Sequence, residues 1–188
     1  MKNTLLALST VVALAVAAPA LAGTLQAEVR FADVTNSARP GATEYKADYS
    51  AALNPTFNYG IEMSTKQKED QGSVDSKLAA RIGTAGPALL GVKTQVYVEG
   101  GTAIKQNADA TFWGAGVKAS RKLFGPVTGS VGYRHRESFA QNDKIKEDRI
   151  NAGVTVDVGN GNSVGAQYYR TSGTSESAAV GLQLSHKF

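Results

Sequence analysis

The chain has 188 residues, with 20 basic and 16 acidic side chains and a formal net charge of +4 at pH 7. This small surplus does not indicate nucleic-acid binding, and the length suits one domain. The chain contains no cysteine, which favours a fold that needs no disulfides. Beyond residue 22, no run approaches the ~18 apolar residues of a membrane helix, so a membrane-spanning mature chain would have to cross with strands.

The first 22 residues have the pattern of a secretory signal peptide. Lys2 gives a positive start, Leu5 to Ala17 is apolar apart from two hydroxyl residues, and Ala20-Leu21-Ala22 fits the small-x-small cleavage site. A membrane anchor helix is the alternative, and Pro19 with the small-residue end argues against it. We therefore expect residues 1–22 to be removed and residues 23–188 to form a single domain.

Taken in order, the remaining chain repeats one pattern, in which every second residue is apolar. It is clearest from residue 149 to 158, where Ile150, Ala152, Val154, Val156 and Val158 alternate with polar or small residues. A period of two predicts strands with one apolar face. Many of the segments reach about ten residues or more, near the ~9–11 of a membrane strand and above the ~5–6 of a soluble one. Ten such segments occur, at residues 24–34, 42–53, 57–64, 77–82, 90–99, 113–119, 127–134, 149–158, 164–168 and 178–188.

Short turns are indicated between alternate pairs of these segments. Asn54-Pro55, Gly86-Pro87, Gly125-Pro126 and Gly159-Asn160-Gly161 are turn sequences, whereas the connections between them are longer and polar. Alternating short turns and long loops are typical of outer-membrane barrels. The predicted fold is therefore a closed antiparallel up-and-down transmembrane β-barrel of ten strands, with eight or twelve as alternatives. An even strand count places both termini on the periplasmic side.

Alternation alone does not say which face is inside, because a soluble lipocalin-like barrel has the same period with its apolar face inward. The polar side of the segments is rich in small residues, including Gly60, Gly114, Gly132 and Gly165. A solvent-exposed face has no need of glycine, whereas a crowded lumen does. We therefore expect the apolar side to face lipid. Two levels of aromatic and apolar residues resemble interfacial girdles: Leu25, Phe57 and Phe188 at the turn end, and Phe31, Tyr45, Trp113, Tyr133 and Tyr168 at the loop end.

The last segment carries Val180, Leu182, Leu184 and the final Phe188 on one side. This pattern resembles the C-terminal assembly signal of bacterial outer-membrane barrels, although His186 stands where that signal usually has an apolar residue. The resemblance implies export to the outer membrane of a Gram-negative bacterium. It also implies contact with the barrel-assembly machinery during insertion, and with lipid and lipopolysaccharide afterwards.

The polar side carries nine basic and five acidic residues. Opposite charges could pair and plug a narrow barrel, or a thin water-filled path could keep an excess of positive charge that favours small anionic solutes. We predict the second, a narrow porin-like channel, with a closed structural or interaction barrel as the alternative. The residues expected to line the pore are Arg30, Lys46, Glu62, Lys77, Arg81, Lys93, Glu99, Lys118, Arg134 and Arg149.

One stretch has a family resemblance. Glu44-Tyr45-Lys46 through Glu62-Met63-Ser64-Thr65-Lys66 is similar to an early hairpin of the small oligogalacturonate-specific porins, in which a strand, a short turn and a strand with an inward glutamate also occur. The resemblance implies uptake of acidic oligosaccharides through a basic lumen. That family has twelve strands, against the ten predicted here, and no binding residue is transferred from it.

An enzyme is the remote alternative. His135-Arg136-Glu137-Ser138 resembles the His, Ser and Glu set of an outer-membrane lipid A deacylase. Ser138, however, falls on the opposite side of the predicted strand from His135, and that family has eight strands. No metal-ligand cluster or nucleotide motif is present. We therefore expect no catalytic activity, no metal and no cofactor.

Overall fold

The computed structural model describes residues 22–32, 41–68, 74–86, 88, 90–104, 109–139, 145–174 and 176–188. Within these ranges no helix is long and apolar enough to cross a membrane. The described elements are ten strands: β1 (Thr24–Ala32), β2 (Ala42–Ala52), β3 (Phe57–Lys68), β4 (Val74–Ala85), β5 (Val92–Ile104), β6 (Ala110–Phe124), β7 (Val127–Ser138), β8 (Lys146–Gly159), β9 (Asn162–Gly173) and β10 (Ser177–Lys187).

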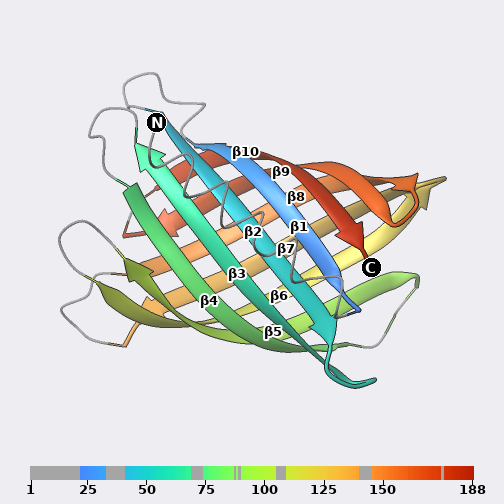
Figure 1. Cartoon of the computed structure of the whole chain (residues 1–188), viewed down its shortest axis with the longest axis horizontal. Helices are drawn as coiled ribbons and strands as arrows, with labels where there is room; N and C mark the ends of the chain where they lie inside the picture. The colour runs from blue at the N-terminus through green and yellow to red at the C-terminus, as the bar shows by residue number, and fades with distance from the viewer. Residues whose placement is uncertain are drawn as a thin grey trace.

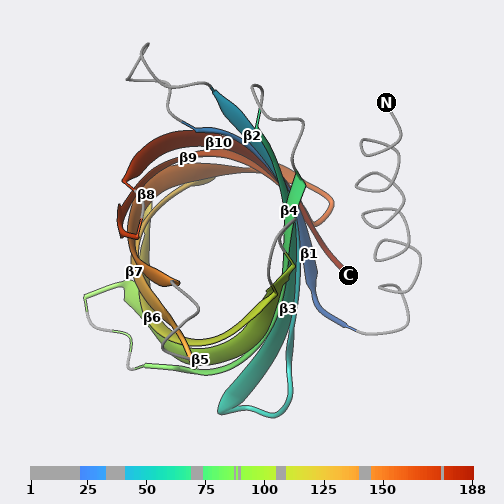
Figure 2. The same ribbon diagram turned by 90° about the vertical axis from the view of Figure 1, so that its left-hand side faces the viewer.

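The strands form one closed antiparallel barrel (Figures 1 and 2). Each strand pairs with its neighbours in sequence, and β1 closes the ring by pairing with β10, with Phe31 opposite Val180. The amide of Phe188 also donates to the carbonyl of Gly23 at 2.9 Å. The seam, meaning the pairing between β1 and β10, is therefore hydrogen-bonded as far as Phe188. The predicted ten-stranded up-and-down barrel is confirmed.

The short turns follow from their sequences. Between β8 and β9, Asn160 and Gly161 have φ values of 53° and 76°, the left-handed conformation that a two-residue type I′ hairpin requires. Between β2 and β3, the side-chain oxygen of Asn54 accepts from the amides of Thr56 and Phe57, both at 2.8 Å, which fixes the chain reversal.

The connections alternate in length less regularly than the sequence suggested. The connection between β4 and β5, residues 86–91, is longer than the connection between β3 and β4, residues 69–73. The sequence predicted the opposite, a short turn between β4 and β5 and a longer loop between β3 and β4. Most of the longer connections lie outside the described residues, as does the predicted signal peptide up to residue 21. The signal peptide therefore stays a prediction.

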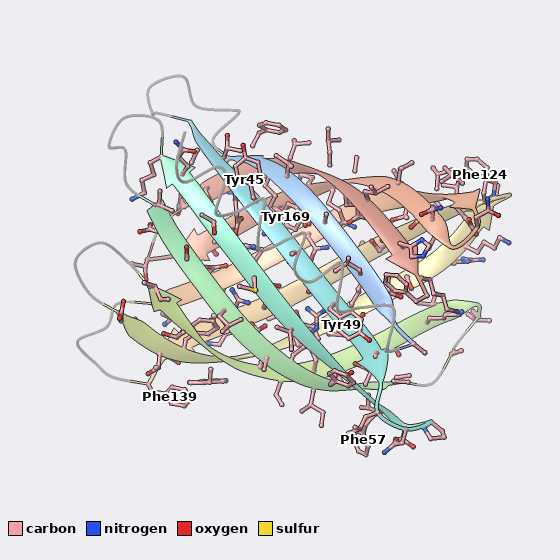
Figure 3. All side chains as sticks on the ribbon, in the orientation of Figure 1. Tyr45, Tyr49, Phe57, Phe124, Phe139 and Tyr169 are labelled. Atoms are coloured by element: carbon pink, nitrogen blue, oxygen red, sulfur yellow. The ribbon has the colours of Figure 1, made fainter. Side chains whose placement is uncertain are left out.

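The two faces of the barrel differ sharply in polarity and burial. Val98, Val131 and Leu182 on the outer face are each 57% exposed, whereas Glu62 and Arg136 on the inner face are 4% and 2% exposed. Figure 3 shows apolar and aromatic side chains projecting outward, with Phe57 and Phe124 near the turn end and Phe139 near the loop end. This is the reverse of a soluble lipocalin-like barrel, so that alternative is wrong. The outer face is the one that a lipid bilayer would cover.

Glycines on the inner face make room for long charged side chains. A Cβ on Gly114 would lie 2.8 Å from the Glu99 carboxylate and 3.0 Å from Cγ of Arg136, and one on Gly60 would lie 2.7 Å from Nε of Arg81. The glycines therefore let the long charged side chains of neighbouring strands lie against the inner surface of the barrel. This is the physical reason for small residues on the polar side of the pattern.

Candidate functional site: a charged lumen

The interior of the barrel is occupied by ion pairs, several of which cross it. Glu62 on β3 contacts two arginines on β7: Arg134 at 3.3 Å and Arg136 at 3.0 Å. Because β3 and β7 are four strands apart in the ring, these pairs span the lumen. Glu62 also accepts from Lys46 on β2 at 2.9 Å and lies 3.9 Å from Arg81 on β4, so one carboxylate joins four strands.

A second carboxylate crosses the lumen nearer the loop end. Glu147 on β8 contacts Lys77 on β4 at 3.2 Å, Arg134 at 3.3 Å and Arg149 at 2.8 Å. Three cations therefore share this one carboxylate. Through Arg134, the group around Glu147 is continuous with the group around Glu62.

A third group lies at the seam between the first and last strands. Arg30 on β1 contacts Glu28 at 2.9 Å and Glu44 at 3.1 Å, and its guanidinium lies 4.1 Å from the ring centre of Tyr169 on β9. The Tyr169 hydroxyl donates to Glu28 by passing over β10 at Gly181, where a Cβ would collide with the Glu28 carboxylate. The Arg149 guanidinium also lies over the Tyr169 ring, 5.8 Å from its centre.

Two cavities flank these groups, each of about 270 Å³. The upper cavity reaches the loop end of the strands and is lined by Glu44, Lys77 and Glu147, among others. The lower cavity reaches the turn end, with Asp48 and Lys118 in its lining. Both are also lined by the same three side chains, Arg30, Arg149 and Tyr169.

An apolar cluster fills part of the lumen on the β4, β5 and β6 side. Phe112 on β6 is 0% exposed and lies in an apolar cluster with Ala79, Ala103, Ala110 and Ile145. Arg136 lies over the Phe112 ring at 4.8 Å and binds Glu99. Phe112, Arg136 and Glu99 line neither cavity. The three residues that line both cavities lie on β1, β8 and β9, so the two spaces meet on that side of the lumen.

Eight of the ten residues predicted to line a pore take part in the interior ion pairs. Lys118 lines the lower cavity and forms no ion pair with any described residue, whereas Lys93 is exposed near the turn end and lines neither cavity. The eight are Arg30, Lys46, Glu62, Lys77, Arg81, Glu99, Arg134 and Arg149.

The sequence overestimated the positive surplus of the interior. Among the described residues, seven cations and six carboxylates share the interior ion pairs, and Lys118 lines the lower cavity without one, against nine basic and five acidic residues expected. Glu44 and Glu147 were not expected there, although each alternates correctly with inward neighbours. Asp157, expected inside, is exposed at the turn end of β8. A small excess of positive charge remains.

A separate polar group lies on the outer face at the loop end. His135 Nδ1 is 2.9 Å from the Asp148 carboxylate, to which Tyr133 also donates, and the Trp113 ring lies 5.6 Å from the imidazole. Ser138 instead bonds to the backbone of Ile145, on the inner side of β7. The histidine and the serine therefore do not form a joint site. In the described part of the chain, no group of three potential metal ligands occurs.

The fold defines a class of protein, the closed antiparallel barrel with a charged interior and an apolar exterior. The chain matches no protein-family model and no curated protein sequence. Among solved structures, it aligns with a bacterial polysaccharide outer-membrane secretin with a TM-score of 0.54 and 8% identity, over 88% of this chain and 65% of the secretin chain. This chain thus spans about two thirds of that protein's length.

Two further alignments cover nearly the whole of the other chain. The β domain of the Bordetella autotransporter BrkA aligns with a TM-score of 0.52 and 10% identity, over 89% of this chain and 98% of its own. A KdgM porin in complex with oligogalacturonate aligns with a TM-score of 0.47 and 8% identity, over 88% and 99%. The weak similarity to oligogalacturonate porins suggested by the sequence is thus present. At these identities, the likeness to the secretin and to the autotransporter domain, each with a TM-score above 0.5, shows the barrel fold and no activity.

Proposed function

We propose that this chain is an outer-membrane β-barrel that acts as a narrow, anion-favouring channel. The observation that carries the proposal is the pair of cavities that reach opposite ends of the lumen and share Arg30, Arg149 and Tyr169 in their linings. One layer of side chains thus separates two spaces of about 270 Å³ each. Fixed positive charge in a narrow path raises the local concentration of anions.

The membrane assignment rests on the outer face. Apolar residues such as Val98, Val131 and Ile150 are more than half exposed there, and closure of the ring pairs the strand edges that a bilayer would not tolerate. Gly23, beside the first described residue, and Phe188 lie together at the turn end of the barrel. In an outer membrane, the short turns and both ends would face the periplasm.

Planar-bilayer recording tests the channel. We expect the wild-type protein to carry small single-channel currents whose reversal potential in a salt gradient reports anion preference, and this preference should shrink at high salt as charges are screened. Lys118→Gln should lower the preference, because Lys118 lines the lower cavity without an ion pair to any described residue. Lys93→Gln, which removes the same charge outside both cavities, is the matched control. A cation preference, or equal effects of the two variants, would contradict the charge assignment.

The second candidate is a closed structural or interaction barrel. The ion pairs from Glu62 to Arg136 and from Lys77 to Glu147 favour it, because they brace opposite walls of the lumen. Current no greater than bilayer leak from a correctly folded barrel would support this candidate and end the channel proposal.

Assembly is proposed to depend on Val180, Leu182, Leu184 and Phe188. The three aliphatic residues point outward from the last strand. The amide of Phe188 donates a hydrogen bond to the carbonyl of Gly23, next to the start of the first strand. Deletion of Phe188 should slow delivery to the outer membrane, because the last strand must close against the first. The measurement is the fraction of newly made chain that reaches the membrane after a pulse of synthesis. Delivery at the wild-type rate would reject the role of this residue.

Lipid hydrolysis is not proposed. The resemblance to a lipid A deacylase needs His135 and Ser138 on one face, and they lie on opposite faces of β7. The simpler role of His135 and Tyr133 is hydrogen bonding in the head-group region of the membrane.

A further inference from the structure

We infer that Tyr169, in contact with Arg30 and near Arg149, is the constriction of this lumen, and that it admits small anions such as chloride and acetate and excludes sugar acids and their oligomers. The inference rests on the proposed channel and identifies its selective residue and substrate class. It follows from the position of the ring, its means of attachment, the distribution of charge around it and the size of the flanking cavities.

The position is set by what each side chain lines. Arg30, Arg149 and Tyr169 belong to both cavities, whereas the cross-lumen groups belong to one or neither: Lys77 lines the upper cavity and Glu62 the lower. Phe112 on β6 and Arg136 on β7, at 0% and 2% exposure, occupy the lumen away from the ring and line neither cavity. A solute moving between the cavities must therefore pass the Tyr169 ring on the β1, β8 and β9 side.

The ring is attached to the wall at one edge. Its hydroxyl donates to Glu28, and its face lies 4.1 Å from the Arg30 guanidinium. Both partners are buried, at 3% exposure each. Because cation–π contacts and hydrogen bonds to carboxylates strengthen in a poorly hydrated site, the ring is held in place without being covalently fixed.

Charge around the ring is uneven. Arg30 contacts two carboxylates, Glu28 and Glu44, so that side carries no surplus of positive charge. Among the described residues, the carboxylate that pairs with Arg149 is Glu147, which also pairs with Lys77 and Arg134. The positive surplus therefore lies on the Arg149 side, and a passing anion would be attracted to that guanidinium.

The size of the cavities limits the solute. Each has a volume of about 270 Å³, below the ~300–1,000 Å³ typical of sites for drug-sized ligands. Such spaces accommodate a hydrated chloride or acetate ion but not a chain of sugar acids. This substrate class differs from the acidic oligosaccharides that the sequence resemblance implied.

Permeability ratios measured in planar bilayers test the constriction, with chloride, acetate and gluconate as probes. Wild-type channels should pass chloride and acetate and largely exclude gluconate. Tyr169→Ala should raise gluconate permeability relative to chloride severalfold. Tyr97→Ala is the matched control, because Tyr97 also lies near an arginine, Arg81 at 5.8 Å, but lines only the lower of the two lumen cavities. Tyr169→Phe, which keeps the ring and loses only the bond to Glu28, should stay close to wild type in gluconate exclusion.

The outcomes separate the constriction from the channel itself. Conduction by the wild type with no change in Tyr169→Ala, or an equal change in Tyr97→Ala, would overturn the constriction and leave the channel standing. A silent wild type with a conducting Tyr169→Ala variant would support the constriction and reject the native channel. Silence in all variants, once each is confirmed to be folded, would reject both.

The Arg149→Gln variant tests whether Arg149 supplies the selective positive charge. This variant should lower the chloride-to-potassium permeability ratio severalfold, because it removes the cation with the weakest neutralisation at the ring. The matched control, Arg170→Gln, removes an exposed arginine from the same end of the barrel, on β9 beside Tyr169 but facing outward. A ratio that falls equally in both variants would place the selective charge elsewhere.

Discussion

Replacing Val154 with arginine is expected to destabilise the folded barrel in lipid by about 2–4 kcal/mol, the cost of a cation on the lipid-facing side near mid-depth. Val154 lies well inside the 14-residue strand β8 and is 45% exposed on the outer face. Thr155, the next residue, points inward, where its hydroxyl accepts from Gln183 at 2.9 Å. Arginine at Thr155 should therefore cost much less, since its charge would lie among polar groups.

Folding titrations into lipid vesicles measure both free energies. The two variants are matched, because each adds one arginine to the same strand and changes the unfolded chain almost equally. Equal costs would show that neither face of β8 is covered by lipid. A larger cost at Thr155 would mean that the lumen has no room for the added side chain.

The architecture was accessible from sequence because two independent signals agree. The period-two pattern in β8 and β10 predicts strands, and the glycines opposite the apolar residues predict which face is inside. Gly114 and Gly60 confirm the reason for the second signal, since a Cβ at either position would collide with an inner charged side chain. Local patterns thus sufficed for the strands and for their facing.

The ion pairs of the lumen could not be predicted from the sequence. They depend on which inward residues the closed barrel places at the same height along its axis. Lys77 and Glu147 are 70 positions apart and lie four strands apart in the ring. Alternation assigns each to the inner face but says nothing of their contact. Glu147 was also assigned to a loop, because the charge run before Arg149 hid the start of β8 at Lys146.

The sequence predicts the orientation of Tyr169 but not its contacts. In the pair Tyr168-Tyr169, alternation places one ring in lipid and the other in the lumen, and Tyr168 was expected in the outer girdle, where it is 47% exposed. The inward position of Tyr169 follows at once from that assignment. Its role depends on Gly181 of β10 and Glu28 of β1, which only the closed seam brings beside it.

Glu62→Gln is expected to have the largest effect on the lumen. Its carboxylate contacts Lys46 at 2.9 Å, Arg136 at 3.0 Å and Arg134 at 3.3 Å, and the residue is 4% exposed. Removing one partner of a buried ion pair typically costs about 3–5 kcal/mol, because the other charge is left without compensation. Here four cations, these three and Arg81 at 3.9 Å, lose a shared partner while the shape of the side chain is kept, so the loss should lie in or near that range.

The matched control is Glu137→Gln, which removes a carboxylate from the outer rim. Glu137 lies 3.7 Å from His135 and its side chain is 47% exposed, so its loss should cost at most about 1 kcal/mol. Unfolding titrations in vesicles at low and high salt distinguish the two sites. The cost at Glu62 should persist at high salt, since buried pairs are screened weakly. A cost at Glu62 no larger than that at Glu137 would mean that water fills the lumen around the arginines, and that the cross-lumen pairs do not brace the barrel.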